Sequence, residues 1–115
     1  MNSPYMDALE ALTRERGVHG GLVVSERDGI VVEANVHTGV KSNIVAALAA
    51  SIYRKTRLAA AAAGLGGVNY LELVAGEGRL CMAGHEDLVV VAITDATATV
   101  GAMRAATIRA AGRIG

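Results

Sequence analysis

The sequence has few of the residues with which proteins usually recognise nucleic acids. Its 115 residues include no Trp or Phe and three Tyr, so aromatic residues make up 3% of the chain, and the formal net charge is zero. Proteins that bind nucleic acids are usually basic, and many of them stack bases on aromatic rings. We therefore expect no nucleic-acid partner.

A single cysteine and short apolar runs exclude two further classes of protein. Cys81 has no second cysteine to pair with, which rules out an internal disulfide and fits a reducing compartment. No apolar run approaches the roughly 18–20 residues that span a bilayer. The first residues also lack a basic segment followed by an apolar one, which a secretory signal requires. We expect a cytoplasmic protein that does not insert into a membrane.

The chain is instead rich in apolar residues, with 52% hydrophobic and 19% charged residues. A chain of this length has enough material for one core and too little for two. No linker, repeat or low-complexity tail interrupts it. We therefore predict a single domain over residues 1–115.

Apolar periodicity and turn residues predict eight elements in the order α-β-β-α-β-β-β-α. The predicted helices run from Ser3-Pro4 to Gly17, over 42–63, and from Asp95 or Thr97 onward; the predicted strands are His19–Ser25, Ile30–Asn35, Val68–Val74, Arg79–Gly84 and Leu88–Thr94. Five strands in hairpin succession predict an antiparallel sheet. The expected fold is an α/β sandwich with a five-stranded antiparallel sheet, the long helix on one face and two helices on the other.

The glycine-bearing and polar segments match no catalytic or cofactor-binding motif. Asp28-Gly29 between two Val/Ile runs predicts a hairpin turn. The glycines at 64–67 follow a helix, and no Lys-Ser/Thr pair comes after them, so they do not form a P-loop. The histidines and the lone thiol match no zinc spacing: His19, His37, His85 and Cys81. We expect no catalytic residue, no metal and no cofactor, and hence no enzyme.

The predicted helix over 42–63 suggests how the protein assembles. From residue 44 to residue 50 there is no polar side chain, so this part of the helix is apolar on every side. Its own sheet can cover one side only. A second copy in a two-fold contact is the simplest cover for the other side. The residues expected on this outward side are Ile44, Val45, Leu48, Ala49 and Ile52.

Two further surfaces have polar patterns with more than one interpretation. Arg54, Lys55 and Arg57 form a basic cluster on the long helix, which is either a solvated face or a contact for an acidic partner. The segment Asn69 to Leu73 alternates polar and apolar residues, as an edge strand or a pairing surface does.

Taken together, these segments resemble the Roadblock (dynein light-chain) family, which includes MglB-like bacterial regulators of Ras-like small GTPases. The resemblance covers nearly the whole chain. It depends on Gly20-Gly21-Leu22-Val23-Val24 leading to Asp28-Gly29, on the long Ala-rich helix, on Glu77-Gly78-Arg79-Leu80, and on Leu88 to Thr94 before a last helix near Val100-Gly101.

The resemblance implies a homodimer in which the long helices pack antiparallel over a sheet that continues through the middle strand. The implied pairing edge is Val68, Asn69, Tyr70, Leu71, Glu72 and Leu73. It also implies that a small GTPase binds the helix pair, with Ser51, Arg54, Lys55 and Arg57 as candidate contacts. Hydrolysis of GTP would be stimulated by biasing the loops of the GTPase. An arginine finger from Arg54 or Arg57 is the less favoured alternative.

Two other functions stay open at this point. One is a dimerisation scaffold for a kinase, motor or membrane-associated complex that leaves GTP turnover unchanged. The other is a small-molecule sensor, because profilin-like sandwiches resemble ligand-sensing modules. The scarcity of aromatic residues and of convergent polar residues in the expected core argues against the sensor.

Overall fold

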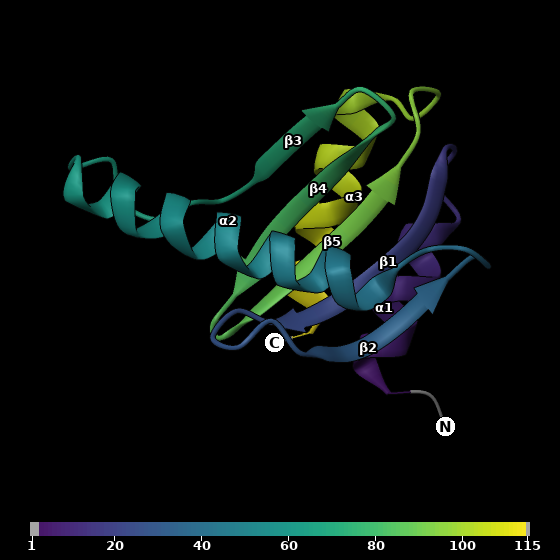
Figure 1. The fold of residues 1–115 in the computed structure, drawn as a ribbon, viewed down its shortest axis with the longest axis horizontal. Helices are drawn as coiled ribbons and strands as arrows, with labels where there is room; N and C mark the ends of the chain where they lie inside the picture. Colours follow the sequence, from purple (N-terminus) through teal and green to yellow (C-terminus); the bar gives the residue numbers. More distant parts are fainter. Residues whose placement is uncertain (1–2, 115) are drawn as a thin grey trace.

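The chain folds into an antiparallel sheet of five strands with helices on both faces (Figure 1). The computed structural model describes residues 3–114. The elements, in chain order, are α1 (Pro4–Thr13), β1 (Val18–Ser25), β2 (Val31–Val36), α2 (Ser42–Ala62), β3 (Leu71–Ala75), β4 (Gly78–His85), β5 (Leu88–Thr94) and α3 (Val100–Arg113). The predicted fold class and element order are confirmed.

The strand order across the sheet is β2-β1-β5-β4-β3, so β2 and β3 are its two edges. This order explains the continuous apolar run of β5. A central strand that is covered on both faces needs apolar residues at every position, and Val89, Val90, Val91 and Ala92 are all fully buried.

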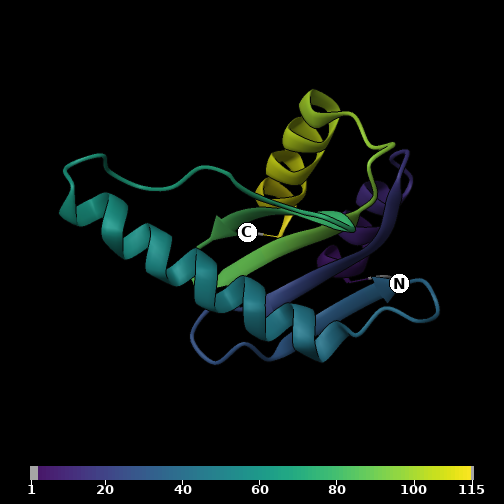
Figure 2. The same ribbon diagram turned by 45° about the horizontal axis from the view of Figure 1, so that its top comes forward.

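The helices divide the molecule into two cores, one on each face of the sheet. α1 packs on β1 and β2, and α3 packs on β4 and β5 of the same face (Figure 2). The core beneath them includes Leu9, Val90 and Met103. α2 crosses the opposite face over a second core that includes Met82 and Tyr53. None of the helices in residues 3–114 has the length and apolar content needed to cross a bilayer.

The turn between β1 and β2 has the geometry that Asp28-Gly29 predicts. Gly29 has a positive φ of 72°, which costs a glycine little because it has no Cβ. The Asp28 carboxylate accepts a hydrogen bond from the backbone N–H of Ile30 at 3.1 Å. Asp28-Gly29 therefore forms the hairpin turn that the sequence predicts.

Two helix boundaries differ from the prediction. α1 ends at Thr13, because residues 14–17 form the turn that leads into β1, and Gly17 closes that turn rather than the helix. α3 begins at Val100, because the Asp95 carboxylate accepts hydrogen bonds from Thr97 and closes a separate turn before the helix. Val100, the first residue of α3, is 54% exposed.

Candidate functional site

The long helix α2 turns one narrow side toward the sheet. Ala46, Ala49, Ala50 and Tyr53 recur at helical spacing, and all four are buried. The small side chains of the three alanines let the helix lie close to the strands. The expectation that Ala49 belongs to the outward side is wrong, since it lies on the same side of the helix as Ala46 and Tyr53.

The opposite side of α2 is apolar and exposed. Ile44 is 66% exposed, Leu48 45% and Leu58 55%, and the exposed Lys55 lies on the same side. The second half of the helix extends beyond the sheet, so its alanines have no strand beneath them (Figures 1 and 2). Val45 and Ile52, also predicted on the outward side, are half-buried at its flanks.

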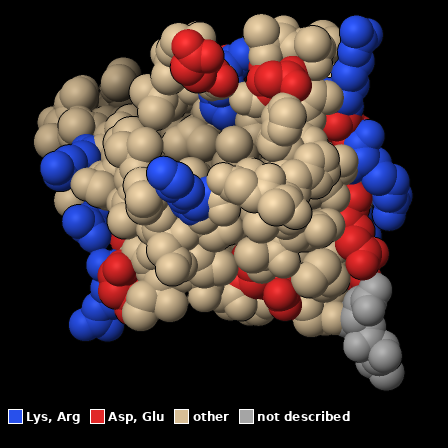
Figure 3. Space-filling view, turned by 45° about the vertical axis from the view of Figure 1, so that its right-hand side comes forward, with Lys and Arg blue, Asp and Glu red and all other residues tan. Residues whose placement is uncertain are grey.

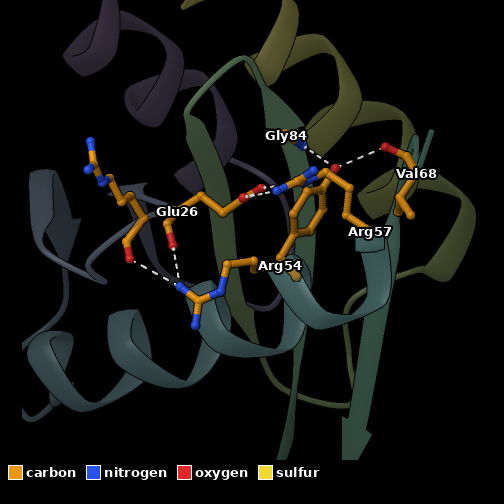
Figure 4. Close-up of polar contacts among 7 residues, drawn as sticks. Glu26, Arg54, Arg57, Val68 and Gly84 are labelled. Carbon is orange, nitrogen blue, oxygen red and sulfur yellow. Dashed lines mark hydrogen bonds and ion pairs between the residues drawn. The ribbon is translucent and has the colours of Figure 1, made fainter. Parts of the chain in front are cut away.

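A buried acidic residue forms an ion pair with the second half of α2, which we call its projecting half because it extends beyond the sheet (Figure 4). Glu26, which directly follows β1, is 8% exposed. Its two carboxylate oxygens accept hydrogen bonds from the Arg57 guanidinium, from Nε at 3.0 Å and from Nη2 at 2.6 Å. This bidentate contact also raises the pKa of Arg57.

Arg54 joins the same contact through backbone groups. Its Nη1 donates to the carbonyl oxygens of Glu26 at 3.3 Å and Arg27 at 3.0 Å (Figure 4). We call Glu26, Arg54 and Arg57 the Glu26 clamp. Two of the three residues in the predicted basic cluster, Arg54 and Arg57, therefore bind Glu26 or the backbone beside it. Lys55 makes no ion pair with any residue between 3 and 114. The sequence did not identify Glu26, because no local spacing links it to a residue on a distant helix.

Tyr53 connects α2 to the edge of the sheet. Its hydroxyl donates to the carbonyl oxygen of Val68 at 2.9 Å and accepts from the backbone N–H of Gly84 at 2.9 Å (Figure 4). The hydroxyl thus occupies the place where Val68 and its neighbours would pair with β4. The prediction of a strand from Val68 is wrong for this reason, and β3 begins at Leu71.

Replacing Tyr53 by phenylalanine is expected to lower the free energy of unfolding by about 1–3 kcal/mol, because the Gly84 N–H and the Val68 carbonyl both lose their partner. Urea unfolding at one fixed protein concentration measures the change. Tyr5→Phe is the matched control and is expected to change stability little, since Tyr5 is only partly buried. Equal losses in the two variants would contradict the role of the Tyr53 hydroxyl.

An apolar groove of about 550 Å³ lies beside the first half of α2. We call it the α2 groove. Val45 and Leu48 of the helix and Leu73, Leu80 and Ile93 of the sheet form its apolar lining. Figure 3 views the molecule partly from this side and shows a broad face with few charged side chains. The polar lining of the α2 groove includes His19, His37, Thr38, Glu77 and Asp95.

A hydrogen-bonded group at this groove links the start of β1 to the segment between β5 and α3. His19 Nε2 lies 2.7 Å from an Asp95 carboxylate oxygen, and the His37 ring packs edge-on against the His19 ring. The Thr97 hydroxyl, the His19 ring and the Thr97 backbone N–H, in that order, lower the pKa of Asp95 to about 2. These bonds favour the ionised carboxylate.

The lowered pKa of Asp95 predicts a loss of stability in acid. The contribution is fully present above the ordinary pKa of 3.8 and is lost as pH falls from about 4 to about 2. Asp95→Asn is therefore expected to be less stable than the parent at pH 7, and the difference should shrink toward pH 2. Thr97→Val should raise the pKa of Asp95 in an NMR titration; an unchanged pKa would contradict the assigned cause.

Cys81 and the neighbouring polar groups have the properties of structural residues. Burial raises the pKa of the Cys81 thiol and also that of Tyr70, whose hydroxyl donates to Glu72 at 3.1 Å. A thiol held protonated in a core is a poor nucleophile. Within residues 3–114 there is no group of three or more His, Cys, Asp or Glu side chains with the geometry of a metal site.

The chain matches a known protein family. The family model of the Roadblock/LC7 domain matches residues 5–95, from α1 through the end of β5. The chain belongs to the Roadblock/LC7 domain family. The resemblance inferred from the sequence is therefore confirmed.

Relatives of this Roadblock chain include two archaeal proteins. MJ0310 and MJ0714 of Methanocaldococcus jannaschii, both uncharacterized, are 27% and 28% identical to it over 106 residues. Each alignment covers 92% of this chain, and 92% and 89% of the respective relative.

Solved structures share the fold of this Roadblock chain at low sequence identity. The gliding protein MglB from Thermus thermophilus superposes with a TM-score of 0.83 at 20% identity, covering 99% of this chain and 90% of that one. Myxococcus xanthus MglB gives 0.84 at 16% identity, with 97% and 92% covered. A Roadblock/LC7 domain from Streptomyces avermitilis gives 0.83 at 14% identity, with 93% and 91% covered.

Proposed function

We infer that this Roadblock chain is a homodimeric regulator that binds a Ras-like small GTPase and modulates its hydrolysis of GTP. The observation that carries the proposal is the outward side of α2, an exposed apolar surface that also presents the cation Lys55. Membership of the Roadblock/LC7 family and the likeness to the MglB fold support it.

Two surfaces of the chain support the dimer. The projecting half of α2 exposes apolar residues, among them Leu58, that extend past its own sheet. The α2 groove is an apolar hollow on the same face. With a two-fold axis at the outer edge of β3, the projecting half of each helix would lie over the groove of the other copy. A similar structure is described as MglB with a tetrameric arrangement, which is self-association in that protein.

Particular residues take defined roles in the proposed dimer. Ile44, Val45, Leu48 and Ile52 would contact the second copy, and β3 would pair with its mate from Leu71 onward, with Glu72 and Leu73 following. Val68, Asn69 and Tyr70 precede the strand and would lie beside the contact rather than within the paired backbone.

The Glu26 clamp restricts how the GTPase can be regulated. Arg54 and Arg57 bind Glu26 and the β1–β2 turn, so neither side chain extends from α2 toward a bound GTPase as an arginine finger would. Ser51 and Lys55 remain as the polar contacts on the outward side. Binding would then act by favouring the GTPase loop arrangement that positions the attacking water.

The test uses every Ras-like GTPase encoded in the source genome, purified and loaded with GTP. Single-turnover phosphate release is measured with and without this protein. Roughly tenfold or greater acceleration of one GTPase is expected, and Lys55→Glu should abolish it. Ile30→Asp is the control, because it places a negative charge at an exposed residue outside α2.

The outcomes separate the candidate functions. Binding of a GTPase without acceleration would favour the scaffold over the regulator. Absence of both binding and acceleration with every GTPase would contradict the proposal.

A further inference from the structure

The face of the sheet opposite α2 is covered unequally. α1 covers β1 and β2, and α3 covers β4 and β5, but within residues 3–114 β3 has neither helix above it (Figure 1). Val74, which lies on this face of β3, is 67% exposed. An edge strand with an uncovered apolar residue has room for another element.

Two grooves border β3 on this face. One of about 510 Å³ is lined by Glu72 and Val74 of β3 and by Val100 of α3. The other, of about 470 Å³, is lined by Arg104 and Ile108 of α3 and by the segment before β3. Val100, Arg104 and Ile108 recur every four residues, so they form one flank of α3. That flank faces β3 and is partly apolar.

The dimer proposed above would join these grooves into a single trough, and the inference rests on that dimer. α3 packs on β4 and β5, so its axis lies about two strand spacings, roughly 10 Å, from the seam of a β3–β3 pair. Two α3 helices would then be about 20 Å apart. Because helices pack at about 8–10 Å, one further helix fits between them.

The charges of the trough select the kind of helix. The floor holds Glu72 from each copy, and Glu77 lines the same groove; neither pairs with a cation among residues 3–114. Arg79 also lines the groove, but its guanidinium donates to the carbonyl oxygens of Ala96 and Ala98, both at 3.1 Å. The floor of the trough is therefore acidic, and each wall carries Val100 and Ile108 with Arg104 between them.

We propose that the α3 face of the dimer is a second docking surface, which binds one amphipathic helix of a partner protein. The helix inserts an apolar stripe between the Val100–Ile108 flanks of the two copies. A Lys or Arg at the middle of that stripe reaches the Glu72 pair. This surface lies on the face of the sheet opposite α2, so the partner helix and the proposed GTPase bind the dimer at once.

The test uses a yeast-displayed library of amphipathic helices about five turns long, with the central stripe position randomised. The probe is the labelled full-length protein, with its mass in solution measured alongside. Enriched helices are expected to carry Lys or Arg at the centre. Val100→Asp should weaken their binding by at least about tenfold, and Ile108→Asp should do the same.

Ala102→Asp is the matched control, since it places the same charge in the first turn of α3 on the opposite flank, and its binding should equal that of the parent. Asp in a first helical turn is compatible with folding. If the protein is a dimer, three results would overturn the trough and leave the dimer standing. They are that no helix is enriched, that the enriched helices carry Glu at the centre, or that the Val100→Asp variant binds the enriched helices as well as the parent does. A monomeric chain would overturn the dimer and the trough together.

Discussion

Leu58→Asp is expected to convert the proposed dimer into a monomer at micromolar concentration. Leu58 is 55% exposed on the part of α2 that extends beyond the sheet. In the proposed dimer its side chain would be buried against the second copy, and a buried unpaired carboxylate costs several kcal/mol. The dimer dissociation constant should therefore rise by about a hundredfold or more. Analytical ultracentrifugation over a dilution series measures it.

The monomeric form of this variant should stay folded, because Leu58 lies outside both cores that residues 3–114 form. The far-ultraviolet circular dichroism spectrum is therefore expected to match that of the parent. Ile30→Asp is again the control and should leave the dissociation constant unchanged. If both variants associated like the parent, the projecting half of α2 would not be the contact.

Arg57→Gln is expected to lower the free energy of unfolding by about 2 kcal/mol, because it leaves the buried Glu26 carboxylate without its bidentate partner. A fully buried pair would lose about 3–5 kcal/mol. The smaller value follows from the Arg57 side chain being 44% exposed, where solvent screens its charge. Urea unfolding at a fixed protein concentration measures the change, since stability is concentration-dependent in a dimer.

The double variant Glu26→Gln, Arg57→Gln separates the ion pair from the loss of packing. Its loss in free energy of unfolding should be smaller than the sum of the losses of the two single variants, with a coupling energy of about 1 kcal/mol. Arg54→Gln is the comparison, because it removes hydrogen bonds to backbone carbonyls and leaves the carboxylate pair intact. Simple additivity would show that the Glu26 clamp contributes no ionic stabilisation.

The sequence predicts the architecture well because its signals are local. Asp28-Gly29 between two Val/Ile runs determines a hairpin, and Ser3 before Pro4 caps α1, where its hydroxyl accepts from the Met6 N–H. The continuous apolar run of β5 indicates a central strand. Each of these features depends on residues a few positions apart, which a sequence displays directly.

The sequence predicts the candidate site less well because the site depends on long-range contacts. Arg54 and Arg57 look like a free basic cluster until Glu26, about thirty positions away, is brought beside them. The sequence predicts Val68 as a strand residue, but its carbonyl oxygen accepts a hydrogen bond from the Tyr53 hydroxyl. Ala49 looks like part of an outward apolar side because alanine suits either a helix pair or a sheet contact.

The mass of the pure chain in solution tests the central claim most directly, namely that a second copy packs against apolar residues of α2 that its own sheet leaves exposed. Multi-angle light scattering at micromolar concentration is expected to give twice the 11.7 kDa of one chain. It should give 11.7 kDa for Leu58→Asp. A parent chain that stays at 11.7 kDa over the whole concentration range would contradict the account.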